Sequence, residues 1–297
     1  MPPSEPTLDE LRREIDRIDA AMHDLLMQRT AVVEEVGRAK ARENPAGAGA
    51  RPQFFRPGRE ALVLRSLIER HTGRFPVASL VRIWREIMTG QLRVQTEIAV
   101  AVYAPPGRGD YWDMARDHYG AGATYTPHHR AQQVVAAVRG GTAGIGVLPM
   151  PQDDDGEPWW PAVATDDTNA PSIVARIPIL DVTGQPGGAL LLANVDPERT
   201  GDDRAYVAVE SAGDASVGGL VAELRAVGLT VRPLVAEAVK GPGGNLHLFE
   251  AGEMVLRDDP RLARVTERGR LPITRAFSLG GYAMPIGSTM SRETAVA

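Results

Sequence analysis

Three basic side chains near the N-terminus, Arg12, Arg29 and Lys40, lie in a stretch whose apolar residues have helical spacing. Arg29 and Lys40 are eleven residues apart. At about 100° per residue this is three turns plus about 20°, so the two cations share one face of a helix. Arg12 precedes Arg29 by seventeen residues, which places it ~25 Å away along the axis and about 100° around it. Arg12 can therefore join a compact site with the other two only from a second, antiparallel copy of the helix.

Four further polar side chains can extend this cationic cluster. Arg59 and Glu60 begin a second helical stretch, and Gln91 and Gln95, at positions i and i+4, project from one face of a third. A pocket of arginines and a lysine with one carboxylate and two amides suits a small dianion, because Arg presents a planar fork to a carboxylate and Lys a compact charge. On spacing alone, the alternative that these charges are solvated on helix surfaces is favoured.

Three helices must position these side chains. The first is predicted over 8–42, where Thr7 and Glu10 form a capping box at its start. Its apolar residues recur at three- and four-residue steps and are Leu8, Leu11, Ile15, Ile18, Met22, Leu25, Leu26, Val32, Val33 and Val36. A loop over 43–57 leads to a helix over 58–72, and a third helix spans 77–96. The first helix is ~50 Å long, so it cannot bury its apolar stripe alone and needs partners.

The order and lengths of these helices, together with their polar residues, resemble the all-helical class of chorismate mutases. The resemblance covers residues 8–97 and rests on Leu11–Arg29, Val36–Lys40, Arg59-Glu60 and Gln91–Gln95. In that family two chains interlock, and each site takes one arginine from the partner chain. The resemblance thus implies a multi-domain protein in which residues 1–97 form an all-α, three-helix chorismate mutase domain within an intertwined homodimer.

The resemblance also implies a role for most of these polar residues. Arg29, Arg59 and, from the partner chain, Arg12 hold the two carboxylates of the substrate chorismate. Lys40 and Gln95 hydrogen-bond the ether oxygen while the C–O bond breaks. The rearrangement to prephenate is unimolecular, so positioning and electrostatic preorganisation are sufficient, and no cofactor or metal is expected.

At the hydroxyl end of the substrate, the resemblance assigns Glu60 to the ring hydroxyl and includes Gln91 among the site residues. Two positions here depart from the family pattern. Arg56 stands where members commonly carry an aspartate, and Gln91 stands where a small hydroxyl residue is common. The hydroxyl-side contacts therefore follow the family less closely than the carboxylate and ether contacts do.

Beyond position 97, strands alternate with helices, which predicts α/β structure. Residues 98–204 resemble the first lobe of prephenate dehydratases, but the Thr-Arg-Phe motif of that family is absent, which predicts a degenerate, non-catalytic lobe. Residues 205–262 are similar to ACT-type regulatory modules, which are α+β units. Such modules bind amino acids at paired interfaces, so we expect either an amino-acid effector or a packing module without ligand. The tail over 263–297 is predicted to be largely irregular.

Composition restricts the class of protein further. The 297 residues carry a formal net charge of -5 and no cysteine, which excludes disulfides and cysteine-ligated zinc. There is no basic footprint for nucleic acid. We find no signal peptide and no apolar run of ~18 residues, so we expect a cytoplasmic protein without a membrane partner.

The sequence therefore predicts a dimeric chorismate mutase of phenylalanine and tyrosine biosynthesis. Two alternatives remain. One is a bifunctional chorismate mutase/prephenate dehydratase, against which the missing Thr-Arg-Phe motif speaks. The other is a non-catalytic aromatic-amino-acid sensor whose helices only dimerise, which predicts no turnover together with a thermal shift on adding phenylalanine or tyrosine.

Overall fold

The N-terminal part of the protein consists of three helices. The computed structural model describes residues 5–43, 55–151, 158–167, 169–180, 187–213, 215–235, 239–241 and 244–287. The three helices are α1 (Leu8–Glu43), α2 (Pro57–Glu69) and α3 (Val77–Gln95). Their bounds agree with the predicted ones within three residues, which confirms the helical unit. Most of the loop predicted over 43–57 lies outside the described residues.

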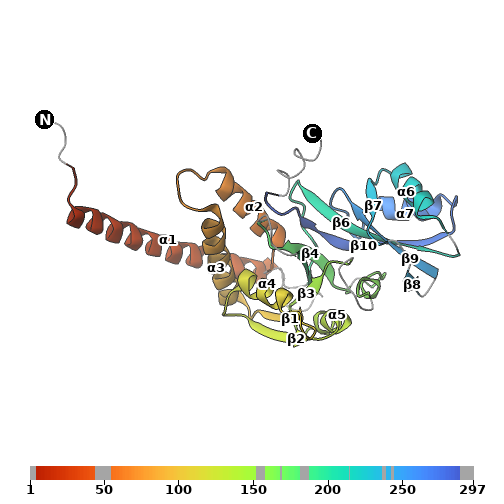
Figure 1. Ribbon diagram of the computed structural model, residues 1–297, viewed down its shortest axis with the longest axis horizontal. Helices are drawn as coiled ribbons and strands as arrows, with labels where there is room; N and C mark the ends of the chain where they lie inside the picture. The colour runs from red at the N-terminus through yellow and green to blue at the C-terminus, as the bar shows by residue number, and fades with distance from the viewer. Residues whose placement is uncertain are drawn as a thin grey trace.

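Helix α1 begins at the predicted capping box, where the Thr7 amide donates to Glu10 Oε2 at 2.8 Å and the Glu10 amide to Thr7 Oγ1 at 3.3 Å. It then reaches away from the rest of the molecule (Figure 1). Its apolar stripe is exposed in the single chain, and Leu25 has a relative exposure of 63%. The exposed apolar residues of α1 are Leu8, Leu11, Ile15, Ile18, Met22, Leu25, Met27, Val32 and Val36. No described helix, α1 included, combines the length and the apolarity that crossing a membrane requires.

The chain next forms an α/β layer. Strands β2, β1 and β3 are parallel neighbours, and β5 and β4 continue the sheet in antiparallel pairing. Helices α4 and α5 belong to two separate apolar clusters, so they cover opposite faces of the sheet. The elements are β1 (Ala99–Tyr103), α4 (Asp110–Tyr119), β2 (Thr124–His128), α5 (Ala131–Arg139), β3 (Ile145–Pro149), the 3₁₀ turn η1 (Trp160–Ala162), β4 (Ser172–Ile177) and β5 (Ala189–Ala193).

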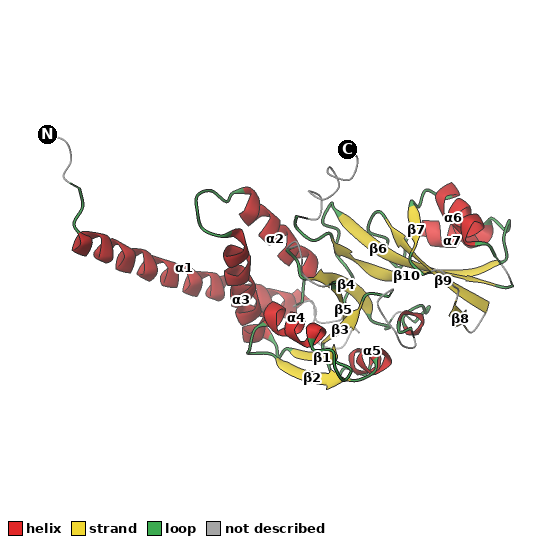
Figure 2. Ribbon diagram, viewed as in Figure 1, coloured by secondary structure: helices red, strands yellow, loops and turns green. Residues whose placement is uncertain are grey.

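The C-terminal part follows a β-α-β-β-β-α-β order. Apart from the short strand β8, which pairs with β9, this is the β-α-β-β-α-β order typical of ferredoxin-like units. Its elements are β6 (Asp203–Ser211), α6 (Val217–Ala226), β7 (Val231–Pro233), β8 (Val239–Gly241), β9 (Gly244–Ala251), α7 (Pro260–Glu267) and β10 (Ile273–Ala283). Helices α6 and α7 lie together on one face of these strands (Figure 2), against β6 residues such as Val207 and Val209. The prediction of a largely irregular tail from position 263 is wrong, because α7 extends into this region and β10 lies wholly within it.

A single sheet includes strands from both parts, in the order β2-β1-β3-β5-β4-β10-β6-β9-β7. The last strand in sequence, β10, lies between β4 and β6 and joins the two parts. Where β10 passes β4, Gly280 has a φ of 98°. A Cβ on Gly280 would lie 2.2 Å from the Ile173 carbonyl oxygen, so only glycine fits this approach. The sheet therefore continues across the predicted boundary between 204 and 205.

Candidate active site

Arg29, in the C-terminal half of α1, and Arg59, in the first turn of α2, lie near each other. Part of the Arg29 side chain remains accessible to solvent. Its partial burial lowers the pKa of the guanidinium, and the positive charge of Arg59 lowers that pKa further. Two neighbouring cations favour a bound anion, because the anion offsets their mutual repulsion.

Lys40 lies in the last turn of α1 and is half-buried. Burial lowers the pKa of its ammonium group, and so does the positive charge of Arg56, while the carboxylate of Glu198 raises it. The C-terminal end of a helix carries negative partial charge that favours a cation. The pKa of Lys40 thus depends on two charged residues outside α1, Arg56 and Glu198.

The two predicted glutamines project from α3 toward α1. The amide nitrogen of Gln95 donates to the Val33 carbonyl oxygen at 2.9 Å. The side chain of Gln91 is buried, and its Nε2 donates to Thr30 Oγ1 at 3.4 Å. The Oε1 atom of Gln91 has no hydrogen-bond partner among the described residues. Both amides therefore face the C-terminal half of α1, which carries the two predicted cations.

Glu60 is paired with a residue that is missing from the predicted site. Its carboxylate forms an ion pair with Arg85 of α3, and the two side chains are only 17% and 6% exposed. Arg85 also donates to the His118 carbonyl oxygen, from Nη2 at 3.2 Å. The spacing of Arg85 from Val81 and Met88 places it on the buried face of α3. A charged residue at an apolar position of a helix is the sequence signal that could have revealed Arg85, because a buried charge requires a partner.

A second carboxylate reaches the site from the segment between β5 and β6. Glu198 Oε1 accepts a hydrogen bond from Arg56 Nε at 2.7 Å, and Oε2 accepts one from the Arg59 backbone N–H at 3.0 Å. Gly58 permits this approach, because a Cβ there would lie 2.6 Å from Glu198 Cβ. No spacing in the sequence relates position 198 to the start of α2, so sequence analysis missed Glu198.

Arg12 is separate from this group. Its side chain is 67% exposed and pairs with Asp9 at 3.3 Å. It lies toward the outer end of α1 (Figure 1). Within one chain, the structure leaves Arg12 apart, pairs Glu60 with Arg85, and brings together Arg29, Lys40, Arg59, Gln91 and Gln95.

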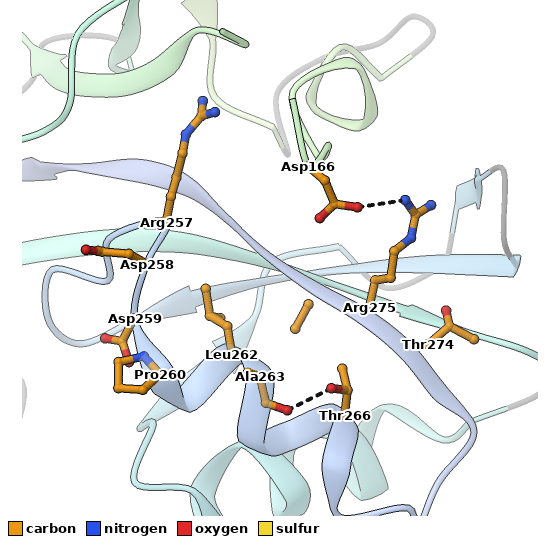
Figure 3. A pocket seen from close by; sticks show the side chains of 11 residues that line it. Asp166, Arg257, Asp258, Asp259, Pro260, Leu262, Ala263, Thr266, Thr274 and Arg275 are labelled. Carbon is orange, nitrogen blue, oxygen red and sulfur yellow. Dashed lines mark hydrogen bonds and ion pairs between the residues drawn. The ribbon is translucent and has the colours of Figure 1, made fainter. Parts of the chain in front are cut away.

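The pocket in Figure 3 lies elsewhere, between α7, β10 and the segment before β4. None of the predicted site residues is among its described lining residues. Arg275 pairs with Asp166 at 3.2 Å and with Glu210 at 2.7 Å. Arg257 donates to the Ala170 carbonyl oxygen at 2.5 Å. These arginines join loops to the sheet, which is a structural role.

Comparison with known proteins finds a family match for the helical part. Residues 11–96 match the family model of chorismate mutase type II. A bifunctional chorismate mutase/prephenate dehydratase from Pseudomonas aeruginosa is 30% identical over 149 residues, which cover 50% of this chain and 40% of that protein. Its counterpart from Aquifex aeolicus is 31% identical over 153 residues, again 50% of this chain and 40% of the relative. The matched part of this chain thus spans less than half the length of these curated relatives.

Among solved structures, a prephenate dehydratase from Arthrobacter aurescens in complex with L-Phe aligns with 67% of this chain and 98% of that chain. The TM-score is 0.46 and the sequence identity is 16%. Residues 11–96, which carry the cationic site between α1, α2 and α3, are thus similar to the chorismate mutase type II family.

Proposed function

We propose that this protein is a chorismate mutase, which rearranges chorismate to prephenate. The observation that carries the proposal is the grouping of Arg29, Lys40, Arg59 and Gln95, from three helices, inside a segment that matches the chorismate mutase type II family. The relatives from P. aeruginosa and A. aeolicus support it, because their names include this activity.

The chemistry requires no nucleophile and no proton relay. Chorismate is an extended diacid, and the reaction proceeds once it is held in a compact, chair-like conformer. Arg29 and Arg59 hold its carboxylates, since a guanidinium matches the planar geometry of a carboxylate. Lys40 and Gln95 donate to the ether oxygen, where negative charge develops as the C–O bond breaks. The protein thus contributes orientation and preorganised charge.

Arg12 is the third arginine that holds the carboxylates of chorismate, and it comes from a second copy of the chain. The exposed apolar stripe of α1 supports this dimer, because one chain leaves side chains such as Ile15, Met22 and Leu25 in water. Two α1 helices that pack antiparallel along this stripe cover it. The same packing brings Arg12 of one chain toward Arg29 and Lys40 of the other.

The C-terminal unit is proposed to be an ACT-like module for an amino-acid effector. A pocket where this unit meets β4 is lined by residues that include Arg176, Arg204, Arg232, Glu250 and Tyr282. Glu250 accepts from Arg232 and from the Tyr282 hydroxyl, each at 2.7 Å, while the buried Nε of Arg176 has no hydrogen-bond partner among the described residues. An amino acid suits these groups, since its carboxylate matches the arginines and its ammonium group matches Glu250.

A thermal shift with phenylalanine or tyrosine that Arg232→Gln abolishes supports this role, and an absence of any shift contradicts it.

The loss of chorismate absorbance with purified full-length protein tests the proposed mutase activity. The chain offers a matched pair of variants, because Lys40 and Lys240 are its only lysines. Lys240 donates to Asn245 Oδ1 at 2.6 Å in the hairpin of β8 and β9, far along the chain from the helical site. We expect Lys40→Ala to lower kcat by about 10²-fold or more, by analogy with the loss of an oxyanion donor.

Lys240→Ala is expected to retain the wild-type rate. A near-normal rate in Lys40→Ala contradicts the role of this lysine at the ether oxygen. If the wild-type protein consumes no chorismate at all, the mutase proposal is wrong and the sensor alternative is favoured.

A further inference from the structure

The segment between β5 and β6 packs directly on helix α2. At one end, Glu198 contacts Arg56 and the backbone of Arg59. Two turns further along α2, Arg65 donates to Thr200 Oγ1 at 2.9 Å and to the Asp202 carbonyl oxygen at 3.0 Å. Arg65 also donates to the Met284 carbonyl oxygen, just after β10, at 3.0 Å. The helix that begins with a predicted site arginine is thus held by the C-terminal part of the chain.

Glu198 satisfies the start of α2, which lacks a local cap. Pro57 is its first residue, and within the described structure the side chain of Arg56, at the N-cap, makes no capping hydrogen bond. The free N–H groups of a first helical turn require acceptors, and a carboxylate there is also favoured by the helix dipole. Glu198 supplies this acceptor from a distant segment, through its hydrogen bond with the Arg59 N–H.

Glu198 also forms an ion pair with Arg56, the arginine that stands where the family pattern has an aspartate. Arg56 and Glu198 are joined through Arg56 Nη2 at 2.5 Å, and the Glu198 side chain is 27% exposed. Without that carboxylate, Arg56 stands as an unbalanced positive charge near Lys40. Like charges close together in a partly buried site disfavour each other's charged forms.

We propose that Glu198 is a positioning residue of the mutase site: it fixes the first turn of α2, which carries Arg59, and holds Arg56 in an ion pair beside Lys40. This inference rests on the proposed function of the helical site. It makes the C-terminal part of the chain a contributor to the mutase reaction, through one side chain.

Kinetics of the full-length protein test this role with Glu198→Gln, Glu198→Asp and a matched control. The control is Asp117→Asn, because Asp117 of α4 pairs with Arg82 of α3 at 3.0 Å on the surface and so also joins the helical unit to the rest of the chain. We expect Glu198→Gln to lower kcat/KM about tenfold, mostly through KM, because Arg59 is less well oriented. Glu198→Asp keeps the charge and is expected to recover part of the loss.

Two kinetic outcomes overturn the proposal. In one, Glu198→Gln and Glu198→Asp behave like Asp117→Asn, whose kcat/KM is expected to equal that of the wild type. In the other, Glu198→Gln raises kcat/KM, which means that the carboxylate occupies the substrate's place and inhibits the enzyme. Melting temperatures measured in parallel identify a variant that does not fold, and Glu198→Asp then decides the question.

A second measurement does not depend on turnover. With labelled lysine, the NMR spectrum of this chain contains signals from two residues only, and Lys240→Arg assigns them. The charged groups that act on Lys40 include Arg56, before α2, and Glu198, in the β5–β6 segment. We therefore expect the pKa of Lys40 to be lower in Glu198→Gln than in the wild type and unchanged in Asp117→Asn.

The two measurements separate two failures. If the wild type consumes no chorismate but the pKa of Lys40 falls in Glu198→Gln, the proposed function is wrong while the contact between Glu198 and the site stands. If the wild type is active and Glu198→Gln changes neither kcat/KM nor the pKa of Lys40, the role of Glu198 is wrong and the mutase proposal stands.

Discussion

Glu60 of α2 and Arg85 of α3 form a buried ion pair, with side chains that are 17% and 6% exposed. Arg85 continues from this pair to the His118 carbonyl oxygen of α4. A line of polar contacts therefore runs from the helix that carries Arg59, through α3, into the α/β layer. It holds α2 from the side opposite to the contacts of Glu198 and Arg65.

Arg85→Ala is expected to destabilise the protein by about 3–5 kcal/mol, because it leaves the Glu60 carboxylate partly buried without its partner. The Arg82–Asp117 pair is the control, since its side chains are 68% and 72% exposed. Arg82→Ala is expected to cost no more than about 1 kcal/mol. Urea denaturation followed by circular dichroism measures both, and equal midpoints for the two variants contradict the proposed importance of the buried pair.

His118, which is half-buried, makes stability depend on pH. Burial, aided by the positive charge of Arg85, lowers the pKa of His118 well below its usual value near 6.5. The folded protein therefore keeps His118 neutral, while the unfolded chain binds a proton below about pH 6.5. The contribution of neutral His118 is complete above that pH and is lost progressively as the pH falls toward the folded-state pKa.

We accordingly expect the melting temperature to fall between pH 7.5 and pH 5.5, and His118→Gln to reduce this fall. His23→Gln serves as the control, because the His23 side chain is exposed on α1. An identical pH dependence in wild type and His118→Gln refutes the assignment to His118.

Features that depend on residues close together in the sequence could be predicted, whereas contacts between distant positions could not. The helices follow from apolar spacing, and the shared face of Arg29 and Lys40 follows from helix geometry. The carboxylate of Glu198 could not be predicted, because its contact with Arg59 spans 139 positions. Strand β10 was missed because Gly280-Gly281 has the composition of a turn, whereas the structure needs glycine there for a close approach to β4.

Gly280→Ala tests this explanation of β10. The substitution is expected to destabilise the protein by at least about 2 kcal/mol, because it combines a strained φ with a clash against the Ile173 carbonyl. Gly218 in α6 is the control, since a Cβ there meets no described atom within 4 Å. Gly218→Ala is expected to be neutral or to stabilise by up to about 1 kcal/mol. Equal melting temperatures for the two variants contradict the requirement for glycine at position 280, where β10 comes close to β4.

The proposed sharing of each site between two chains predicts complementation. Arg12→Ala and Lys40→Ala are each expected to be nearly inactive. A co-expressed mixture is expected to regain about a quarter of the wild-type activity, because half of the dimers are mixed and each mixed dimer contains one site with both residues intact. Only the summed activity of the two variants is expected if each site is built from a single chain, and that result rules out the contribution of Arg12 across the interface.

The identity of the product tests the central claim most directly. Purified full-length protein is incubated with chorismate, and phenylpyruvate is measured in one sample treated with acid, which converts prephenate to phenylpyruvate, and in one left untreated. We predict that chorismate disappears and that phenylpyruvate forms only after acid, as expected for a mutase with a non-catalytic dehydratase-like part. Phenylpyruvate without acid contradicts the non-catalytic assignment and establishes a bifunctional enzyme. Unchanged chorismate in both samples contradicts the mutase itself.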